Sequence, residues 1–347
     1  MVLFVVSTWG EGRGGHFNTL ATYIKAYKSP YHILVVGKNI PPVLKEFEVN
    51  ITQTSLSLIP KIELNQKFEI IHCFDQWAYL IGFIYASKCE KVKLILTKSG
   101  GINTIWFPRA RNMWLISKEN YDYYSSFKSV EKIKFYDNRV VDFDLIDVSH
   151  LKEKFQNSCI ILRIGRISEY YRKSFSKMMD YSKKYEKCKF VVIGTVESDL
   201  LYNELIASNI EVLNQPEYTK NARKYLGLAD LFIGQGRSAM EAIFKEIPTF
   251  VFNNKHNALD LVESQNIETV KFQNFSERAT FDSSCNLEEY ITSKDHKMIT
   301  NLRPYVEYNP TQLTNFYEVL HSKKIKFSAF PLLLYLRYVV RILKRKR

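Results

Sequence analysis

The segment GQGRSAMEAIFKEIPTFVF, residues 234–252, places two glycines, an arginine and a serine directly before a stretch with helical periodicity. Gly236, Arg237 and Ser238 fall at the predicted helix N-terminus, and Glu241 follows one turn later. A helix N-terminus presents free N–H groups and a partial positive charge, which suit a phosphate. An ordinary strand–turn–helix junction would also place glycine here, for its backbone freedom. The segment therefore predicts either a phosphate site or a simple junction.

Cationic side chains follow the predicted strand CIILRIG, residues 159–165. Arg166 comes directly after this strand, and Arg172 and Lys173 lie on the next turn or helix. An arginine can hold a diphosphate with two parallel N–H bonds, so these cations suit a diphosphate ligand. A solvated helix face would carry the same charges, and the sequence leaves both interpretations open.

A glycine-rich loop separates the first predicted strand from the first predicted helix. It has the sequence STWGEGRGGHFNTLA and ends its run of glycines with Gly14 and Gly15. Open α/β sheets bind ligands beyond the carboxyl ends of their strands, so this loop is placed for a ligand unless it is only a flexible turn. Gly10, Gly12 and Gly15 have the G-x-G-x-x-G spacing, but this motif alone is weak evidence, and a dinucleotide cofactor is not expected.

The elements that must position these residues alternate between short β-branched runs and amphipathic stretches, which is typical of a parallel sheet covered by helices. The series of strands restarts near residue 159, which predicts two Rossmann-like domains. We expect an N-terminal domain at 1–150, a C-terminal domain at 151–322 and a terminal helix at 323–347. The predicted strands are VLFVVS, YHILVVG, FEIIHCF, VKLILT and MWLIS, and then CIILRIG, KFVVIG, IEVLN, DLFIG and IPTFVF.

Composition excludes several classes of protein. The 347 residues are 46% hydrophobic and 24% charged, which is typical of a folded chain. Five scattered cysteines without a C-x-x-C pair argue against a disulfide framework or a zinc site and favour a reducing compartment. Of the net charge of +13, nine positive charges lie from Lys323 onward, where there is no acidic residue. The body is therefore nearly neutral, and a nucleic-acid partner is not expected.

The C-terminal stretch FSAFPLLLYLRYVVRILKRKR predicts a basic amphipathic helix. Pro331 can open it, and Arg337, Arg341 and Lys344 form one polar stripe. The apolar run is too short to cross a bilayer. It suits an interfacial helix on an anionic membrane surface, or alternatively a helix that packs on the first domain.

Taken together, the order and spacing of these motifs resemble bacterial glycosyltransferases of the GT-B architecture, most closely glycosyltransferase family 4 of the surface-polysaccharide type. The motifs are the Gly-Gly loop, EIIHCFDQW, DNRVVDFD, GRI with basic residues after it, and GQGRSAMEA. The resemblance implies an α/β fold of two Rossmann-like domains with an interdomain cleft. It also implies transfer of a sugar, with retention, from a nucleotide-sugar donor to a lipid-linked or saccharide acceptor in polysaccharide synthesis at the inner face of the plasma membrane.

The resemblance assigns roles to residues on the donor side. Gly14 and Gly15 would contact the donor, and Arg166 with Lys173 or Arg172 would neutralise the leaving nucleoside diphosphate. Glu241 would bind the ribose hydroxyls. Catalysis would thus fall to Arg166, Lys173 and Glu241, and donor binding to Gly14, Gly15, Arg172, Gly194, Gly236, Arg237 and Ser238.

The acceptor side departs from the family pattern. TKSGG, residues 97–101, stands where the family carries a histidine, so Lys98 is the candidate there, together with His16 and Asp75 at predicted strand ends. His72 has apolar neighbours, which favours a structural role. Only the second member of the family's Glu pair is present, because Ile233 occupies the first position.

Two further expectations and two alternatives follow from the resemblance. Enzymes of this architecture use cationic side chains and helix dipoles in place of a metal, so neither a metal nor a cofactor is expected, although Asp142 and Asp144 mimic an Asp-x-Asp motif. A nucleotide-sugar 2-epimerase shares the architecture and is the first alternative. A catalytically silent assembly partner is the second, because one glutamate is missing.

Overall fold

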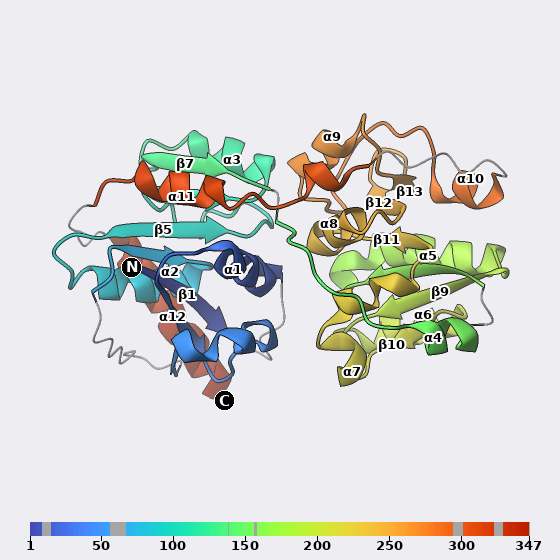
Figure 1. The fold of residues 1–347 in the computed structure, drawn as a ribbon, viewed down its shortest axis with the longest axis horizontal. Helices are drawn as coiled ribbons and strands as arrows, with labels where there is room; N and C mark the ends of the chain where they lie inside the picture. The colour runs from blue at the N-terminus through green and yellow to red at the C-terminus, as the bar shows by residue number, and fades with distance from the viewer. Residues whose placement is uncertain are drawn as a thin grey trace. The chain divides into compact units, whose positions relative to one another are not determined.

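The computed structural model describes residues 1–8, 15–55, 67–137, 139–155, 158–293, 301–322 and 329–346. The chain divides into two compact units. The first unit comprises Met1–Asp137 and Asn309–Arg347, and the second comprises Asn138–Tyr308. Both ends of the chain therefore belong to the first unit (Figure 1).

The first unit is built on a seven-stranded parallel sheet in the order β3-β2-β1-β4-β5-β6-β7. The central strand β1 is buried along its whole length, as expected of a strand covered on both faces. The strands are β1 (Val2–Thr8), β2 (Tyr31–Gly37), β3 (Ile51–Thr54), β4 (Ile70–Cys73), β5 (Lys93–Lys98), β6 (Asn112–Leu115) and β7 (Lys132–Phe135).

Helices cover this sheet through apolar faces. In α1, Leu20, Tyr23 and Ile24 are buried, and the indole N–H of Trp114 on β6 donates to the Tyr23 hydroxyl at 2.6 Å. The helices of the first unit are α1 (Gly15–Ala26), the 3₁₀ segment η1 (Pro42–Asn50), α2 (Gln76–Ala86), α3 (Lys118–Ser125), α11 (Thr311–Glu318) and α12 (Ala329–Lys346).

The second unit is built on a six-stranded sheet in the order β10-β9-β8-β11-β12-β13. Its strands run parallel except β13, which returns antiparallel to β12 through a short turn. The strands are β8 (Cys159–Ile164), β9 (Cys188–Ile193), β10 (Glu211–Leu213), β11 (Leu231–Ile233), β12 (Thr249–Asn253) and β13 (Ala258–Leu261).

Two apolar cores lie in the second unit. One includes Phe175 and Met178 of α5 against β8 and β9, and the other includes Met240 and Phe244 of α8. The helical elements are α4 (Ser149–Lys154), η2 (Glu169–Tyr171), α5 (Arg172–Lys184), α6 (Asp199–Ala207), α7 (Pro216–Thr219), η3 (Ala222–Leu228), α8 (Gly236–Phe244), α9 (Ile267–Phe272), α10 (Leu287–Thr292) and η4 (Arg303–Tyr305).

The boundaries of the units differ from the expected 1–150 and 151–322, and nonlocal contacts explain the difference. The Val140 amide donates to the Val306 carbonyl, the Tyr308 amide donates to the Val140 carbonyl, and Val140 is buried in a core of the second unit. Conversely, α11 packs on the first unit, where the Tyr317 hydroxyl is hydrogen-bonded to His72 Nδ1 at 2.7 Å. Residues near 140 therefore belong to the second unit, and residues 309–322 belong to the first.

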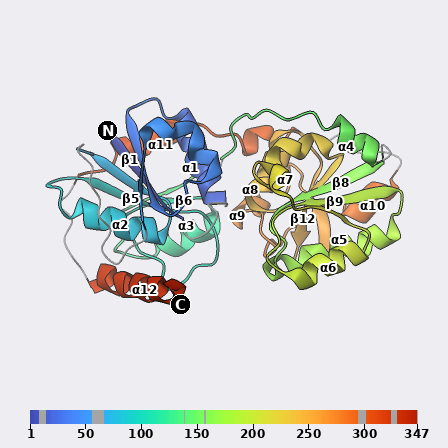
Figure 2. The ribbon, with the colours of Figure 1, turned by 90° about the horizontal axis from the view of Figure 1, so that it is seen from below.

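The C-terminal helix α12 packs on the first unit. Leu334, Tyr338 and Ile342 are buried in the core that includes α2, and Tyr338 lies 5.9 Å from Trp77, centroid to centroid. Figure 2 shows α12 beside α2. The helix starts at Ala329, and no helix in the described part of the chain is long and apolar enough to span a membrane. The structure thus shows that one face of α12 packs on the first unit, while Leu333, Leu336 and Val340 are exposed.

Candidate functional site

Each sheet has one point where its strand order reverses, which is where open α/β sheets bind ligands. In the first unit this point lies between β1 and β4, and in the second it lies between β8 and β11. Arg166 follows β8, and Gly236 follows β11. The structure therefore brings the two predicted donor-side segments to the carboxyl ends of neighbouring strands.

Backbone close approach accounts for Gly194, at the end of β9. A Cβ atom placed on Gly194 would lie 1.7 Å from the carbonyl oxygen of Gly165, which follows β8. No side chain fits there, so Gly194 lets two strand ends come together beside Arg166. This role is structural, and a donor contact by Gly194 stays a prediction.

Arg166 is exposed at this edge, with 54% of its side chain accessible. One guanidinium nitrogen lies 3.0 Å from Glu197 Oε1, and the other lies 3.1 Å from the Tyr171 hydroxyl. Burial lowers the pKa of Arg166, but Tyr171 and Glu197 outweigh it and the net shift is upward. Because exposed ion pairs contribute little free energy, the guanidinium can exchange Glu197 for an anionic ligand at small cost.

Arg172 is instead held by two carboxylates of its own chain. Its Nε and Nη2 bind both oxygens of Glu169 at 2.6 and 2.8 Å, and Nη1 binds Glu204 of α6. The hydrogen bond from Arg172 lowers the pKa of Glu169 to about 2. Arg172 is thus neutralised within the fold, which weakens its case as a donor-binding residue.

Lys173 is exposed in the first turn of α5. Its Nζ donates to Asn254 Oδ1 at 2.7 Å, in the turn that follows β12. Asn254 is a neutral amide, so this hydrogen bond does not neutralise the positive charge of Lys173. Of the two cations predicted to work with Arg166, Lys173 is the better placed.

The N-terminus of α8 is partly occupied by the protein itself. Gly236 has φ +53°, a left-handed conformation that favours glycine, and its N–H donates to the Phe275 carbonyl at 3.0 Å. Ser238 Oγ donates to the Gln235 carbonyl at 3.0 Å. Arg237 and Ser238 lie in the first turn of α8, which is where a helix can bind a phosphate through its amides. A phosphate cap by these amides stays a prediction.

Glu241 and Arg237 form a buried ion pair on α8. Arg237 Nε lies 2.8 Å from Glu241 Oε1, their side chains are 5% and 6% exposed, and Arg223 Nη1 lies 3.8 Å from the same oxygen. One carboxylate oxygen of Glu241 is therefore already paired with arginines of the second unit. Ribose binding by Glu241 stays a prediction, and it would need the other oxygen or a shift of Arg237.

In the first unit, the predicted acceptor-side carboxylate is a helix cap. Asp75 accepts from the Ser7 amide and hydroxyl at 2.8 and 2.7 Å, and from the amides of Trp77 and Ala78 at 2.9 Å each. It therefore fixes the start of α2 to the end of β1. An acceptor contact by Asp75 is an additional role that stays a prediction.

His16 lies in the first turn of α1 and interacts with Asp75. Burial lowers the pKa of His16, and the Asp75 carboxylate opposes part of that effect. The structure thus brings these two predicted residues together at the β1–β4 switch point. Gly15 begins α1 with open space around it, whereas Gly14 lies outside the described residues.

Lys98 ends β5 as a buried cation. Its Nζ donates to the carbonyls of Gly100 and Gly101 at 2.8 and 3.2 Å and lies 5.0 Å from the centre of the Phe107 ring. The ammonium group of Lys98 thus stabilises the loop that follows β5 by bonding its carbonyls. An acceptor contact by Lys98 also stays a prediction.

His72 has the structural role that its apolar neighbours indicate. It is fully buried, with Nδ1 bonded to the Tyr317 hydroxyl and Nε2 bonded to Thr97 Oγ1 at 2.6 Å. Burial lowers its pKa to about 3. His72 is therefore a neutral group that ties α11 to the centre of the sheet.

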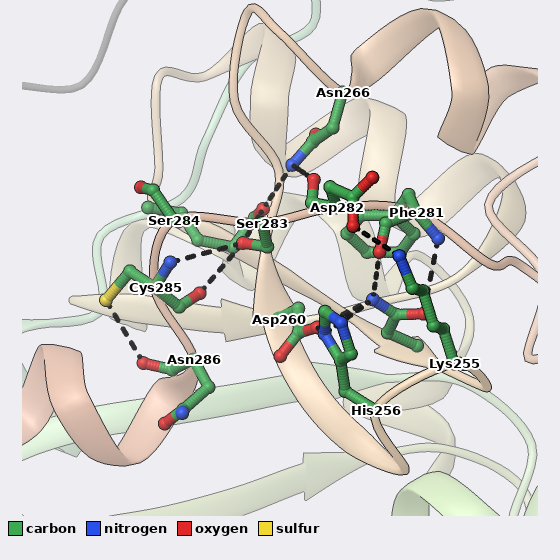
Figure 3. Close-up of polar contacts among 12 residues, drawn as sticks. Lys255, His256, Asp260, Asn266, Phe281, Asp282, Ser283, Ser284, Cys285 and Asn286 are labelled. Carbon is green, nitrogen blue, oxygen red and sulfur yellow. Dashed lines mark hydrogen bonds and ion pairs between the residues drawn. The ribbon is translucent and has the colours of Figure 1, made fainter.

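A histidine–aspartate pair near the donor-side edge was missed at the level of sequence. His256 Nδ1 lies 2.7 Å from Asp260 Oδ2 (Figure 3). Asn253 Nδ2 donates to the same oxygen at 2.7 Å. The signal was the polar run NNKHN directly after the strand IPTFVF. Because a parallel strand places the residues after it at the ligand-binding edge, such a run can indicate a site.

No cluster of three or more His, Cys, Asp or Glu side chains is placed to hold a metal ion in the ranges that the structure describes. In the Asp-x-Asp sequence, Asp142 accepts from Lys245 Nζ and from the Phe143 amide, at 2.8 and 2.9 Å. This aspartate thus has a local structural partner.

No protein-family model matches the sequence, and no curated protein matches it. Solved structures do match. Alr3699/HepE of Anabaena in complex with UDP and glucose has a TM-score of 0.53 and 11% identity, over 72% of this chain and 79% of that chain. Its complex with UDP-glucose has a TM-score of 0.52 and 11% identity, over 71% and 79%. S. aureus MnaA with UDP has a TM-score of 0.54 and 11% identity, over 94% and 99%.

These likenesses show the fold. The chain has the GT-B architecture of two Rossmann-like domains, as the sequence predicted. A UDP-GlcNAc 2-epimerase from Neisseria meningitidis, bound to UDP-GlcNAc, matches with a TM-score of 0.44 and 14% identity, over 73% of this chain and 82% of that chain.

Proposed function

We propose that the protein is a metal-independent, retaining glycosyltransferase of the family 4 type. In this proposal it transfers a sugar from a nucleotide-sugar to a lipid-linked or saccharide acceptor in the synthesis of a surface polysaccharide. The carrying observation is that the exposed Arg166 follows β8 and Lys173 is bonded to the turn after β12, while α8 begins after β11, the strand between them. UDP and UDP-glucose in the Anabaena structures support a nucleotide-sugar as the ligand of such a fold.

The chemistry that this proposal asks of the chain is electrostatic. Breaking the bond between the sugar and the diphosphate leaves negative charge on the phosphate oxygens. Arg166 and Lys173 would neutralise that charge, and the amides of Arg237 and Ser238 would add hydrogen bonds. Glu241 would orient the ribose. His16, held near Asp75, would face the acceptor from the first unit.

A panel of nucleotides tests the proposal. UDP, GDP and CMP, with their sugar conjugates, should include a ligand that raises the melting temperature, because a ligand at about 100 times its Kd adds about 2.7 kcal/mol of stability. The selected nucleotide-sugar should then transfer its sugar only when an acceptor is present. Conversion of the nucleotide-sugar to its 2-epimer without an acceptor would favour the epimerase instead. Binding without either turnover would favour the silent assembly partner.

We also propose that the first unit binds the cytoplasmic face of an anionic membrane. On α12, the side chains of Leu333, Leu336 and Val340 are all about half exposed, on the side away from the buried Leu334 and Tyr338. Their spacing of three and four residues places them on one stripe of the helix. An apolar stripe on a helix rich in Lys and Arg suits the interface of an anionic bilayer.

The segment between β5 and β6 extends this surface. Ile105 and Trp106, which follow the loop anchored by Lys98, are 65% and 52% exposed. Arg337 of α12 lies 5.2 Å from the centre of the Trp106 ring, and its Nη1 lies 3.5 Å from the Trp106 carbonyl oxygen. The loop and the helix stripe are therefore neighbours. Because the loop starts at the carboxyl end of β5, this surface supports an acceptor that is carried by a lipid.

Co-sedimentation with vesicles rich in phosphatidylglycerol tests this second proposal. The parent protein should pellet with these vesicles and not with phosphatidylcholine vesicles, and salt should weaken the binding. Trp106→Ser and Leu336→Ser should each reduce binding, whereas Leu200→Ser, at an exposed leucine of the second unit, should not. Truncation before α12 is a poor test, because it removes buried core residues. Equal binding by all variants would refute the proposed surface.

A further inference from the structure

The turn between β12 and β13 carries a polar group that the donor-side assignments do not use. Residues 254–257 form this turn at the carboxyl end of β12, and β12 pairs with β11, whose end opens α8. Lys173 of α5 reaches the turn through its hydrogen bond to Asn254. The turn therefore lies at the same edge of the second sheet as the cations proposed to bind the diphosphate.

His256 in this turn is oriented by a buried network. Asp260 on β13 is only 2% exposed, and its Oδ2 binds His256 Nδ1 (Figure 3). The same oxygen accepts from the fully buried Asn253. Asn253 Oδ1 in turn accepts from the Lys255 amide at 3.0 Å. The imidazole is thus fixed through one nitrogen by groups on both strands of the hairpin.

The other side of the ring remains available. The His256 side chain is 40% exposed, and among the described residues no hydrogen bond to its Nε2 occurs. With Nδ1 bonded to a carboxylate, a protonated imidazole directs its second N–H outward from Nε2.

We propose that His256, positioned by Asp260, donates a hydrogen bond from Nε2 to a phosphate oxygen of the nucleotide. This proposal rests on the proposed function, because it adds a residue to the same diphosphate site. His256 would be a binding residue that carries charge only when protonated, unlike Arg166 and Lys173. The contribution of His256 to nucleotide affinity would then depend on pH.

Other charged groups lie around His256 and can also change nucleotide affinity with pH. Asp260 faces it from β13, and Asp282, from the segment between α9 and α10, interacts with it and is paired with Lys255. Lys173 approaches from α5. The phosphate of the ligand also titrates, so the useful quantity is the ratio of the Kd of a variant to that of the parent at each pH.

Calorimetric titration with UDP, or with GDP if the nucleotide panel selects it, tests the proposal. At pH 6, His256→Gln should raise the Kd about tenfold, as expected for one charge-assisted hydrogen bond, and at pH 8 the ratio should fall to about two. Asp260→Asn should weaken binding less, and the double variant should bind no more weakly than His256→Gln alone. His150→Gln, at an exposed histidine of α4, is the matched control and should match the parent at both pH values.

The outcomes separate this proposal from the proposed function. A ratio near one at both pH values, while Arg166→Ala still weakens binding, would remove His256 from the site and leave the diphosphate site intact. A loss that is equal at both pH values would show a structural effect of the turn and would also refute the proposal. A parent protein that binds no nucleoside diphosphate would refute both.

Discussion

The ligand-binding edges of the two sheets use their charged side chains differently. In the second unit, Arg166 and Lys173 are exposed and held by weak surface contacts. In the first unit, Asp75 caps a helix with four hydrogen bonds, and Lys98 is buried among backbone carbonyls. The exposed charges of the second unit can bind a ligand at small cost, whereas these charges of the first unit maintain the fold.

The same contrast appears within the second unit. The Arg237–Glu241 pair is buried in α8, but the Arg166–Glu197 pair is exposed at the edge. Breaking a buried pair leaves a charge without its partner in a poorly solvated place, and breaking an exposed pair leaves it in water. The sequence does not distinguish these two pairs, although breaking the buried pair should cost much more stability than breaking the exposed one.

The largest expected effect breaks the buried pair. Glu241→Ala should lower the free energy of unfolding by about 3–5 kcal/mol, because Arg237 loses its carboxylate partner. Glu197→Ala, at the exposed pair, should cost about 1 kcal/mol or less. Chemical denaturation of both variants measures the difference, and similar losses would contradict the assignment of buried and exposed roles.

The next effect concerns the backbone beside Arg166. Gly194→Ala should cost about 3 kcal/mol, because its Cβ would lie 1.7 Å from the Gly165 carbonyl oxygen and the strand ends would have to separate. Gly165→Ala is the matched control, since no atom lies within 4 Å of its added Cβ. Thermal unfolding compares the two variants, and an equally small loss in both would show that the strand ends are free to move apart.

A smaller effect is expected in the first unit and depends on pH. The folded-state pKa of His72 is about 3, below its ordinary value near 6.5, so between these values only the unfolded state binds the proton. Stability should be complete above pH 6.5 and fall by about 2 kcal/mol by pH 5. His72→Gln should flatten this part of the stability–pH curve. Parallel curves for the variant and the parent would show that His72 does not titrate on unfolding.

The smallest expected effect is none. Because Arg166, Lys173 and the α8 amides would supply the positive field, sugar transfer should proceed at the same rate in excess EDTA. Initial rates with and without EDTA measure this. If sugar transfer strictly requires Mg²⁺ or Mn²⁺ and Asp142→Ala abolishes the metal-dependent activity, a bound metal stabilises the charge instead of these cations.

Much of the fold could be predicted from the sequence, because the central strands are runs of apolar and β-branched residues. All ten predicted strands are present. The strands that were missed, β3, β7 and β13, lie at sheet edges and are short and partly polar. The boundary near residue 140 was also missed, because it depends on backbone pairing with residues 306 and 308, more than 160 residues away.

The site was predicted less completely, because it too depends on contacts between residues that are far apart in the sequence. Glycines and cations after strands indicate the ligand-binding edge, so Arg166 and Lys173 could be placed at that edge, and their contact with a diphosphate stays a prediction. Their partners come from distant segments: Glu204 neutralises Arg172, and the Phe275 carbonyl takes the N–H of Gly236. Asp260 likewise fixes His256 only because β13 folds back on β12. Such pairings decide which charges remain free, and local sequence does not show them.

The central claim is that the exposed cations of the second unit bind a nucleoside diphosphate. Calorimetric titration of UDP and GDP into the parent, Arg166→Ala, Lys173→Ala and Arg172→Ala tests it most directly. Arg166→Ala and Lys173→Ala should each weaken binding by about 1.5–3 kcal/mol, the value of a hydrogen bond to a charged group. Arg172→Ala should change the affinity little, because its guanidinium is already paired with Glu169 and Glu204. If Arg166→Ala and Lys173→Ala bind both nucleotides as the parent does, the diphosphate site is not at this edge.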